Sequence, residues 1–80
     1  LNIIGVRASV VAFQSENDTI VSARSFGQVN VQIVMEKLGG GGNITSAGAQ
    51  LRNTSLEEAE PRLLDAISEY LGEDDRKDKL

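Results

Sequence analysis

Three segments in the first third of the chain differ in their pattern of apolar and polar residues. Residues 3–13, IIGVRASVVAF, are apolar and rich in β-branched side chains, a pattern typical of a largely buried strand. Residues 14–18, QSEND, have the composition of a turn. Residues 19–25, TIVSARS, alternate loosely and indicate a second strand. The pattern therefore predicts an antiparallel hairpin with a loop of about five residues.

An amphipathic helix is predicted next, over residues 29–38. Gly27 interrupts the strand pattern, and the apolar positions that follow have the i, i+3, i+4, i+7 spacing of one helix face. These positions are Val31, Val34, Met35 and Leu38. The helix should end at the glycine run that follows Leu38, and residues 47–53, AGAQLRN, are interpreted as a third strand.

The last predicted element is a second helix that begins after residue 55. Ser55 followed by Glu58 matches a capping box. Gly72 should supply the left-handed residue that ends the helix, and Pro61 predicts either a kink or a late helix start. The apolar face comprises Leu56, Ala59, Leu63, Ile67, Tyr70 and Leu71.

The order strand–strand–helix–loop–strand–helix predicts a small two-layer α+β domain. We expect a mixed sheet of three or more strands with two helices packed on it. The domain should span residues 1–72, and the polar sequence EDDRKDKL at 73–80 should form a charged, disordered tail. Because the chain begins at Leu1 rather than Met, we expect it to be a piece of a longer protein.

Composition narrows the functional classes. The chain has 80 residues and a net charge of −4, which argues against a general affinity for nucleic acid. It contains no Cys and no His, so it can offer neither a thiolate nor an imidazole ligand to a metal. No apolar run approaches the roughly 20 residues of a membrane span, and we expect a cytoplasmic domain.

The run of four glycines after the first helix allows two interpretations. One glycine suffices to end the helix, and the others could form a mobile loop. If the run is ordered, it costs about 2–4 kcal/mol relative to alanines. A ligand that approaches the backbone closely, or an anion held by successive N–H groups, would explain that cost. The residues are Gly39, Gly40, Gly41 and Gly42.

Two polar residues upstream are candidates for the same site. Arg24 stands in the sequence Ser22-Ala23-Arg24-Ser25, with a hydroxyl residue on either side, which suits a bidentate phosphate donor. A surface ion pair is the plainer alternative for this arginine. Asn30 stands at the predicted helix start, where it could be a cap or a polar ligand contact; local sequence favours the cap.

Taken in order, these motifs resemble a known family. VSARS at 21–25, VNV at 29–31, the glycines at 39–42 and AGAQ at 47–50 are similar to the C-terminal, substrate-binding domain of DHH-superfamily phosphoesterases. The resemblance covers residues 5–71. The sequence of these motifs is most similar to that of the membrane-anchored cyclic di-AMP phosphodiesterases of Gram-positive bacteria.

The resemblance implies a two-domain hydrolase that opens a cyclic dinucleotide to the linear form. Its DHH catalytic domain would hold two manganese ions, so this chain alone should contain no catalytic or metal-binding residue and should be inactive. It also implies a membrane-anchored parent protein, and a homodimer is a further expectation. The implied substrate contacts are Arg24, Ser25, Asn30, Gly39, Gly40, Gly41, Gly42 and Asn43.

One position departs from the family pattern, because Asn43 stands where the family has His. An amide can donate a hydrogen bond but cannot carry a proton or a positive charge. Three alternatives therefore stay open: a phosphoesterase acting on short linear oligonucleotides, the RNA-binding and dimerisation domain of an alanyl-tRNA synthetase-like protein, and a nucleotide sensor that has lost hydrolysis.

Overall fold

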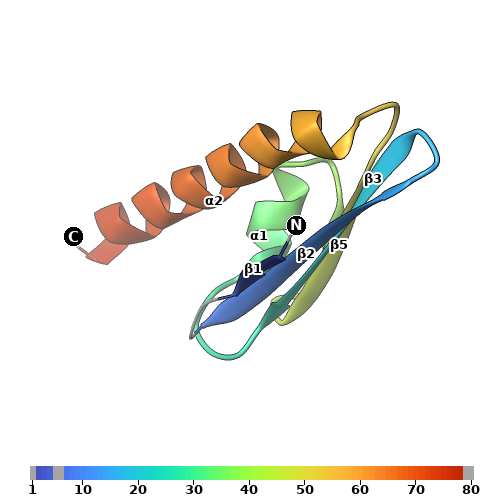
Figure 1. Ribbon diagram of the computed structural model, residues 1–80. Coiled ribbons are helices and arrows are strands. Elements are labelled where there is room, and N and C mark those ends of the chain that lie inside the picture. The colour runs from blue at the N-terminus through green and yellow to red at the C-terminus, as the bar shows by residue number, and fades with distance from the viewer. Residues whose placement is uncertain (1, 5–6, 79–80) are drawn as a thin grey trace.

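A five-stranded antiparallel sheet with two helices on one face forms the structure (Figure 1). The computed structural model describes the backbone of residues 2–4 and 7–78, and the side chains of residue 2 and residues 7–72. The strand order is β1-β2-β3-β5-β4, and every neighbouring pair is antiparallel. In chain order the elements are β1 (Asn2–Ile4), β2 (Ala8–Ser15), β3 (Asp18–Ser25), α1 (Val31–Glu36), β4 (Gly41–Gly42), β5 (Ser46–Leu51) and α2 (Leu56–Asp78).

The predicted α+β class, with two helices packed on a sheet, is confirmed, but the details of the sheet differ. The single strand expected over residues 3–13 is divided between β1 and β2, which pair with each other. The first hairpin loop has two residues, Glu16 and Asn17, rather than about five, because pairing continues to Ser15 and Asp18. Glu16 takes a positive φ of 57°, which makes this tight turn possible. The sheet is antiparallel rather than mixed.

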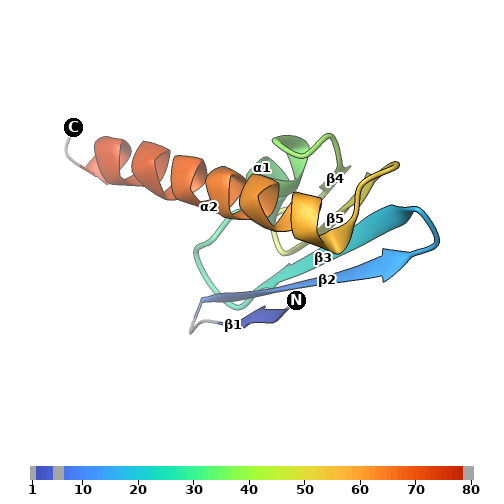
Figure 2. The ribbon, with the colours of Figure 1, turned by 45° about the horizontal axis from the view of Figure 1, so that its top comes forward.

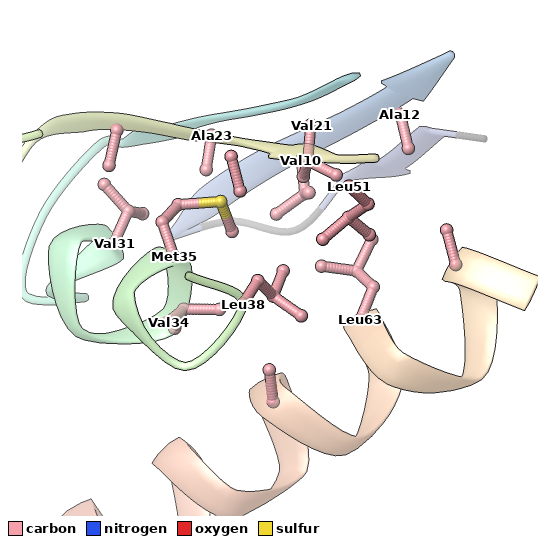
Figure 3. Packing of buried hydrophobic residues seen from close by; sticks show 14 of the residues in the cluster. Val10, Ala12, Val21, Ala23, Val31, Val34, Met35, Leu38, Leu51 and Leu63 are labelled. Atoms are coloured by element: carbon pink, nitrogen blue, oxygen red, sulfur yellow. The ribbon is translucent and has the colours of Figure 1, made fainter. Parts of the chain in front are cut away.

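Both helices lie on the same side of the sheet, as Figure 2 shows. Side chains along β3 alternate accordingly, with Val21 and Ala23 buried beneath the helices and Ser22 and Arg24 exposed on the other side. Figure 3 shows Met35 of α1 and Leu63 of α2 on the same side of the sheet, with Leu63 next to Leu51 of β5. The helix-facing core includes Val10, Ala12, Val21, Ala23, Val31, Val34, Met35, Leu38, Ala47, Ala49, Leu51, Ala59, Leu63, Ala66 and Tyr70.

Helix α1 is shorter than predicted, but the four apolar positions of its expected face are all buried. The glycine run ends it: the Gly40 N–H donates to the Met35 carbonyl (2.9 Å), and the Gly39 N–H donates to the Glu36 carbonyl (3.0 Å). With Gly39 at φ +83°, these are the two bonds of a Schellman motif. The predicted role of Gly39 in stopping this helix is confirmed.

Helix α2 begins as predicted and ends later. The Glu58 N–H donates to Ser55 Oγ, and the Ser55 N–H donates to Glu58 Oε1, which completes the capping box. Pro61 lies inside one continuous helix, so a late start is wrong (Figure 1). Gly72 does not stop the helix, and Leu71, placed on the buried face by the sequence pattern, is 54% exposed.

The backbone of residues 73–78 is helical and continues α2. The predicted disorder of the charged tail over 73–80 stays a prediction, and residues 79–80 lie outside the described residues. Within the described part of the chain, no helix is both long and apolar enough to cross a bilayer.

Candidate phosphate-binding site

Three segments meet at one end of the sheet: the end of β3, the start of α1 and the loop of residues 43–45. The Ser25 N–H donates to the Thr45 carbonyl (2.9 Å), and the Val31 N–H donates to the Ile44 carbonyl (3.1 Å). Two short backbone hydrogen bonds therefore attach this loop to β3 and to α1. Most of the polar residues that the sequence singled out come together here.

Asn43 is built into the loop through its side-chain oxygen. Its Oδ1 accepts hydrogen bonds from the Ser46 N–H (2.8 Å), the Thr45 N–H (3.0 Å) and the Thr45 hydroxyl (3.1 Å). The Asn43 N–H in turn donates to the Ser46 carbonyl (2.9 Å), so the side chain closes the β4–β5 turn. The Nδ2 group makes no hydrogen bond to the described residues, which leaves an exposed donor for a ligand.

Asn30 caps α1, as its local sequence suggested. Its Oδ1 accepts from the Ile33 N–H (3.3 Å), and its own N–H donates to the hydroxyl of the buried Tyr70 (3.0 Å). This link through Tyr70 joins the start of α1 to α2. A ligand contact through Asn30 is therefore limited to its Nδ2 group, and that role stays a prediction.

Ser25 is half-buried at the end of β3 and has a local partner. Its hydroxyl donates to the Gly27 carbonyl (3.2 Å) and accepts from the Gly27 N–H (3.3 Å). These bonds shape the turn that leaves β3. A role for the Ser25 hydroxyl in phosphate binding stays a prediction.

Arg24 differs from its neighbours because its side chain has no partner among the described residues. It is exposed on the face opposite the helices, and it makes no hydrogen bond or ion pair to the described residues. The ion pair found among the described residues joins Lys37 to Glu69 (3.2 Å), so the surface-pair alternative for Arg24 is not supported. Directly across the sheet from Arg24 lies Ser46, whose N–H binds Asn43.

The charge pattern of the chain isolates Arg24 from carboxylates. All acidic residues except Glu16, Asp18 and Glu36 fall in the segment that forms α2. Glu16 and Asp18 stand at the hairpin turn, the opposite end of β3 from Arg24. An acidic chain thus presents, on an acid-poor part of its sheet, a guanidinium that no described residue pairs with, and this local arrangement favours an anion.

The four glycines do not act as one anion nest. The N–H groups of Gly39 and Gly40 are used within α1's terminus. A Cβ at Gly40 would collide with the Gly48 carbonyl oxygen, and a Cβ at Gly42, where φ is +144°, would lie 2.5 Å from Ala47 Cα. Only Gly41 combines an ordinary φ with open space around its Cβ direction. Packing and backbone shape therefore explain why three of these positions are glycine, whereas Gly41 has no such reason. Substrate contacts by any of the four stay a prediction.

Sequence reasoning missed Arg7 because it lay within a predicted strand. The Phe26 N–H donates to the Arg7 carbonyl (2.7 Å), which places Arg7 at the same end of the sheet as Arg24. Its exposed side chain adds a second positive charge to that end. The absence of acidic residues between Leu1 and Glu16, visible in the sequence, was the signal that could have identified it.

The chain's own residues do not fit a metal centre. The sequence has no His and no Cys, and among the described side chains no three acidic groups gather as ligands. The residues that meet at this end of the sheet are donors, which suit an anion rather than a cation.

The chain is similar to a known domain family and to several known proteins. The chain matches the family described as the DHHA1 domain over residues 1–73. It is 46% identical over 71 residues to the cyclic-di-AMP phosphodiesterase PdeA of Listeria monocytogenes and 51% identical over 71 residues to the cyclic-di-AMP phosphodiesterase GdpP of Bacillus subtilis. Each match covers 88% of this chain and 11% of the relative.

A third relative has a different activity. The bifunctional oligoribonuclease and PAP phosphatase NrnA of Thermus thermophilus is 42% identical over 67 residues, which is 84% of this chain and 21% of that protein. The chain thus spans about a tenth to a fifth of the length of these relatives.

Proposed function

The chain belongs to the DHHA1 domain family of the DHH phosphoesterases, and from that premise we propose that it binds the substrate phosphate of a phosphodiesterase that opens cyclic di-AMP to the linear dinucleotide. The two cyclic-di-AMP phosphodiesterases described above support this substrate. Catalysis would belong to a DHH domain with manganese in the same protein, as the family resemblance implies.

Arg24 carries the proposal. Its unpaired guanidinium can donate two parallel hydrogen bonds to a phosphodiester, and the Nδ2 group of Asn43 offers a further donor beside the neighbouring Ser46. Both groups are positioned by backbone that is already ordered, since Arg24 lies within paired β3 and Asn43 closes a hydrogen-bonded turn. Preorganised donors stabilise a phosphate without the entropic cost of ordering a loop.

The test is hydrolysis of cyclic di-AMP by the full-length protein with manganese. We expect Arg24→Ala to lower kcat/KM about 10- to 100-fold, the equivalent of losing a charge-assisted hydrogen-bonded contact. The kcat/KM of Arg24→Lys should lie between those of the wild type and Arg24→Ala, because an ammonium retains the positive charge but not the paired donors of the guanidinium. Arg62→Ala, an exposed arginine of α2, is the matched control. Equal kcat/KM for Arg24→Ala and Arg62→Ala would overturn the proposal.

A second candidate is a phosphoesterase for short linear oligonucleotides. The likeness to the Thermus oligoribonuclease favours it, and the same donors would hold a linear phosphodiester. Parallel assays with cyclic di-AMP, linear di-adenylate and a short RNA oligonucleotide separate the two candidates. A kcat/KM for either linear substrate above that for cyclic di-AMP would make the second candidate the function.

A further inference from the structure

The face of the sheet opposite the helices, which we term the open face, carries Arg24 of the proposed phosphate site and a regular set of further side chains that this site does not use. Both helices lie on the other side of the sheet (Figure 2), and alternation along the strands directs every second side chain to the open face. The central part of the open face is formed by Ser9, Val11 and Phe13 of β2, Ile20, Ser22 and Arg24 of β3, Ser46, Gly48 and Gln50 of β5, and Gly41 of β4. Around it lie Asn2 of β1, which pairs with Val11, and Ser15 and Asp18, which pair with each other at the hairpin end.

Strand register arranges the central residues of the open face in three parallel rows. The first row is Ser9–Arg24–Ser46, and the third is Phe13–Ile20–Gln50. Between them the middle row runs Val11–Ser22–Gly48–Gly41. Ser22, Gly48 and Gly41 give most of the middle row small side chains or none. Arg24 stands in the row on one side of it and Phe13 in the row on the other.

Phe13 is a large exposed apolar residue of the open face, in the third row. Phe13 is 51% exposed. Phe26, the other of the chain's two Phe residues, is exposed as well, so neither ring belongs to the core. Val11 beside Phe13 is also exposed, and Ile20 opposite Phe13 is half-buried. An exposed aromatic ring forgoes the stabilisation that burial would bring, and rings on open sheet faces are used elsewhere to stack nucleobases.

Gly41 is the second observation that points to a ligand. Paired residues of antiparallel strands direct their side chains to the same face, so a Cβ on Gly41 would project onto the open face beside Gly48. It would meet no atom of this chain within 4 Å, and the φ of Gly41 is accessible to any residue. Packing therefore gives no reason for glycine here, whereas a planar group resting on the backbone does.

We propose that the middle row of the open face receives a nucleobase of the substrate, with its phosphate on Arg24 and Phe13 in contact with the base. Arg24 and the partner of Phe13, Ile20, are four residues apart in β3, or about 13 Å along the strand. With the reach of the two side chains, a single nucleotide bridges that interval. The positive charge at one end favours a nucleotide over an apolar partner surface.

This inference rests on the proposed function and adds a base-specific contact to it. Its test compares binding of AMP with binding of ribose 5-phosphate, which lacks the base, to the full-length protein without added metal. We expect Phe13→Ala to weaken AMP binding about tenfold, as for loss of one stacked base, and to leave ribose 5-phosphate unchanged. Phe13→Tyr should restore AMP binding. Leu64→Ala, at a similarly exposed position (48%) on α2, is the control and should affect neither ligand.

Arg24→Ala separates failure of this inference from failure of the proposed function. It should weaken both ligands, because both carry the phosphate. If Arg24→Ala weakens both while Phe13→Ala weakens neither, the base contact is wrong and the phosphate site stands. If Arg24→Ala also has no effect, the phosphate site itself is wrong. Conversion of a dimer to a monomer by Phe13→Ala, with AMP affinity unchanged, would show that a second copy covers the open face and would overturn the inference.

Discussion

Each glycine of residues 39–42 meets a different physical demand. Gly39 is left-handed at the end of α1, Gly40 passes against the backbone of β5, and Gly42 combines a positive φ with a close approach to Ala47. Gly41 has neither constraint. A run that looks uniform in sequence therefore contains three structural positions and one that is free to serve a ligand.

Alanine substitutions should separate these roles. We expect Gly40→Ala and Gly42→Ala to lower the free energy of unfolding by about 1–3 kcal/mol or more, because the added methyl group overlaps backbone atoms of β5. Gly39→Ala should cost about 1–2 kcal/mol for its left-handed conformation. Gly41→Ala should change stability by less than about 0.5 kcal/mol. Urea unfolding of the four variants measures this directly, and Gly27→Ala, at a position outside the helices with an ordinary φ and open space at its Cβ, is the control for the substitution itself.

Asp18 connects two elements at the end of the sheet away from Arg24. Its Oδ1 accepts from the Asn53 N–H (3.0 Å) and its Oδ2 from the Gln50 side chain (2.8 Å). Beside it, the buried Thr19 hydroxyl donates to the Thr54 carbonyl (2.8 Å). These bonds tie the start of β3 to the segment that leads from β5 into α2, so the first hairpin and the last helix are held together at this point.

The stability of the fold should depend on the charge of Asp18. The Asn53 N–H, followed by the Gln50 amide and the Arg52 charge, lowers the pKa of Asp18 below its usual value of about 4. A lowered pKa in the folded state stabilises the protein above the usual pKa, and this contribution is lost as pH falls through the folded-state pKa. The unfolding midpoint in urea should therefore exceed that of Asp18→Asn at pH 7, and the difference should narrow below about pH 4.

Asp65→Asn is the control for the loss of one carboxylate, because Asp65 is exposed on α2 and has no hydrogen bond to the other described residues. A difference between wild type and Asp18→Asn that stays constant from pH 7 to pH 2.5 would contradict a stabilising role for the Asp18 carboxylate.

At the scale of the whole molecule, the two faces of the sheet have different tasks. Helices α1 and α2 cover one face (Figure 2) and complete the core, while the open face carries Arg24 and Phe13. On the proposed function, a catalytic domain in the same protein would approach a substrate on the open face without displacing the core. Asn43 lies in the loop between β4 and β5. Its Oδ1 accepts hydrogen bonds from backbone N–H groups of this loop and of Ser46, and its Nδ2 group makes no hydrogen bond to the described residues.

The role of Asn43 can be measured only in the full-length protein. A side chain that transfers a proton in the reaction typically contributes about 10²–10⁴-fold to the rate. Exchanging one hydrogen-bond donor for another changes the rate far less. Because Asn43 keeps a donor, we expect wild type to hydrolyse cyclic di-AMP with manganese and Asn43→His to change kcat by less than about tenfold. Gln28→His, an exposed position on the β3–α1 turn, is the control. A wild type without turnover that Asn43→His activates would instead support the nucleotide-sensor alternative.

Local patterns predicted much of the fold because they depend on neighbours in sequence. The Ser55–Glu58 capping box, the buried face of α1 and the helix stop at Gly39 are all settled within a few residues of chain. The end of α2 was not predictable in this way. Gly72 weakens a helix but does not forbid one, and the structure continues the helix past it.

Tertiary structure decided which residues meet across the sheet. The sequence by itself determined the α+β class, the composition that excludes a His or Cys metal site, and the family, through motifs that are local in the chain. Only strand register placed Arg24 beside Ser46 and Asn43, aligned Gly41 with Gly48, and showed that Gly40 and Gly42 are required by packing. The physical reason is that register and close approach between strands depend on residues far apart in sequence, which no single segment encodes.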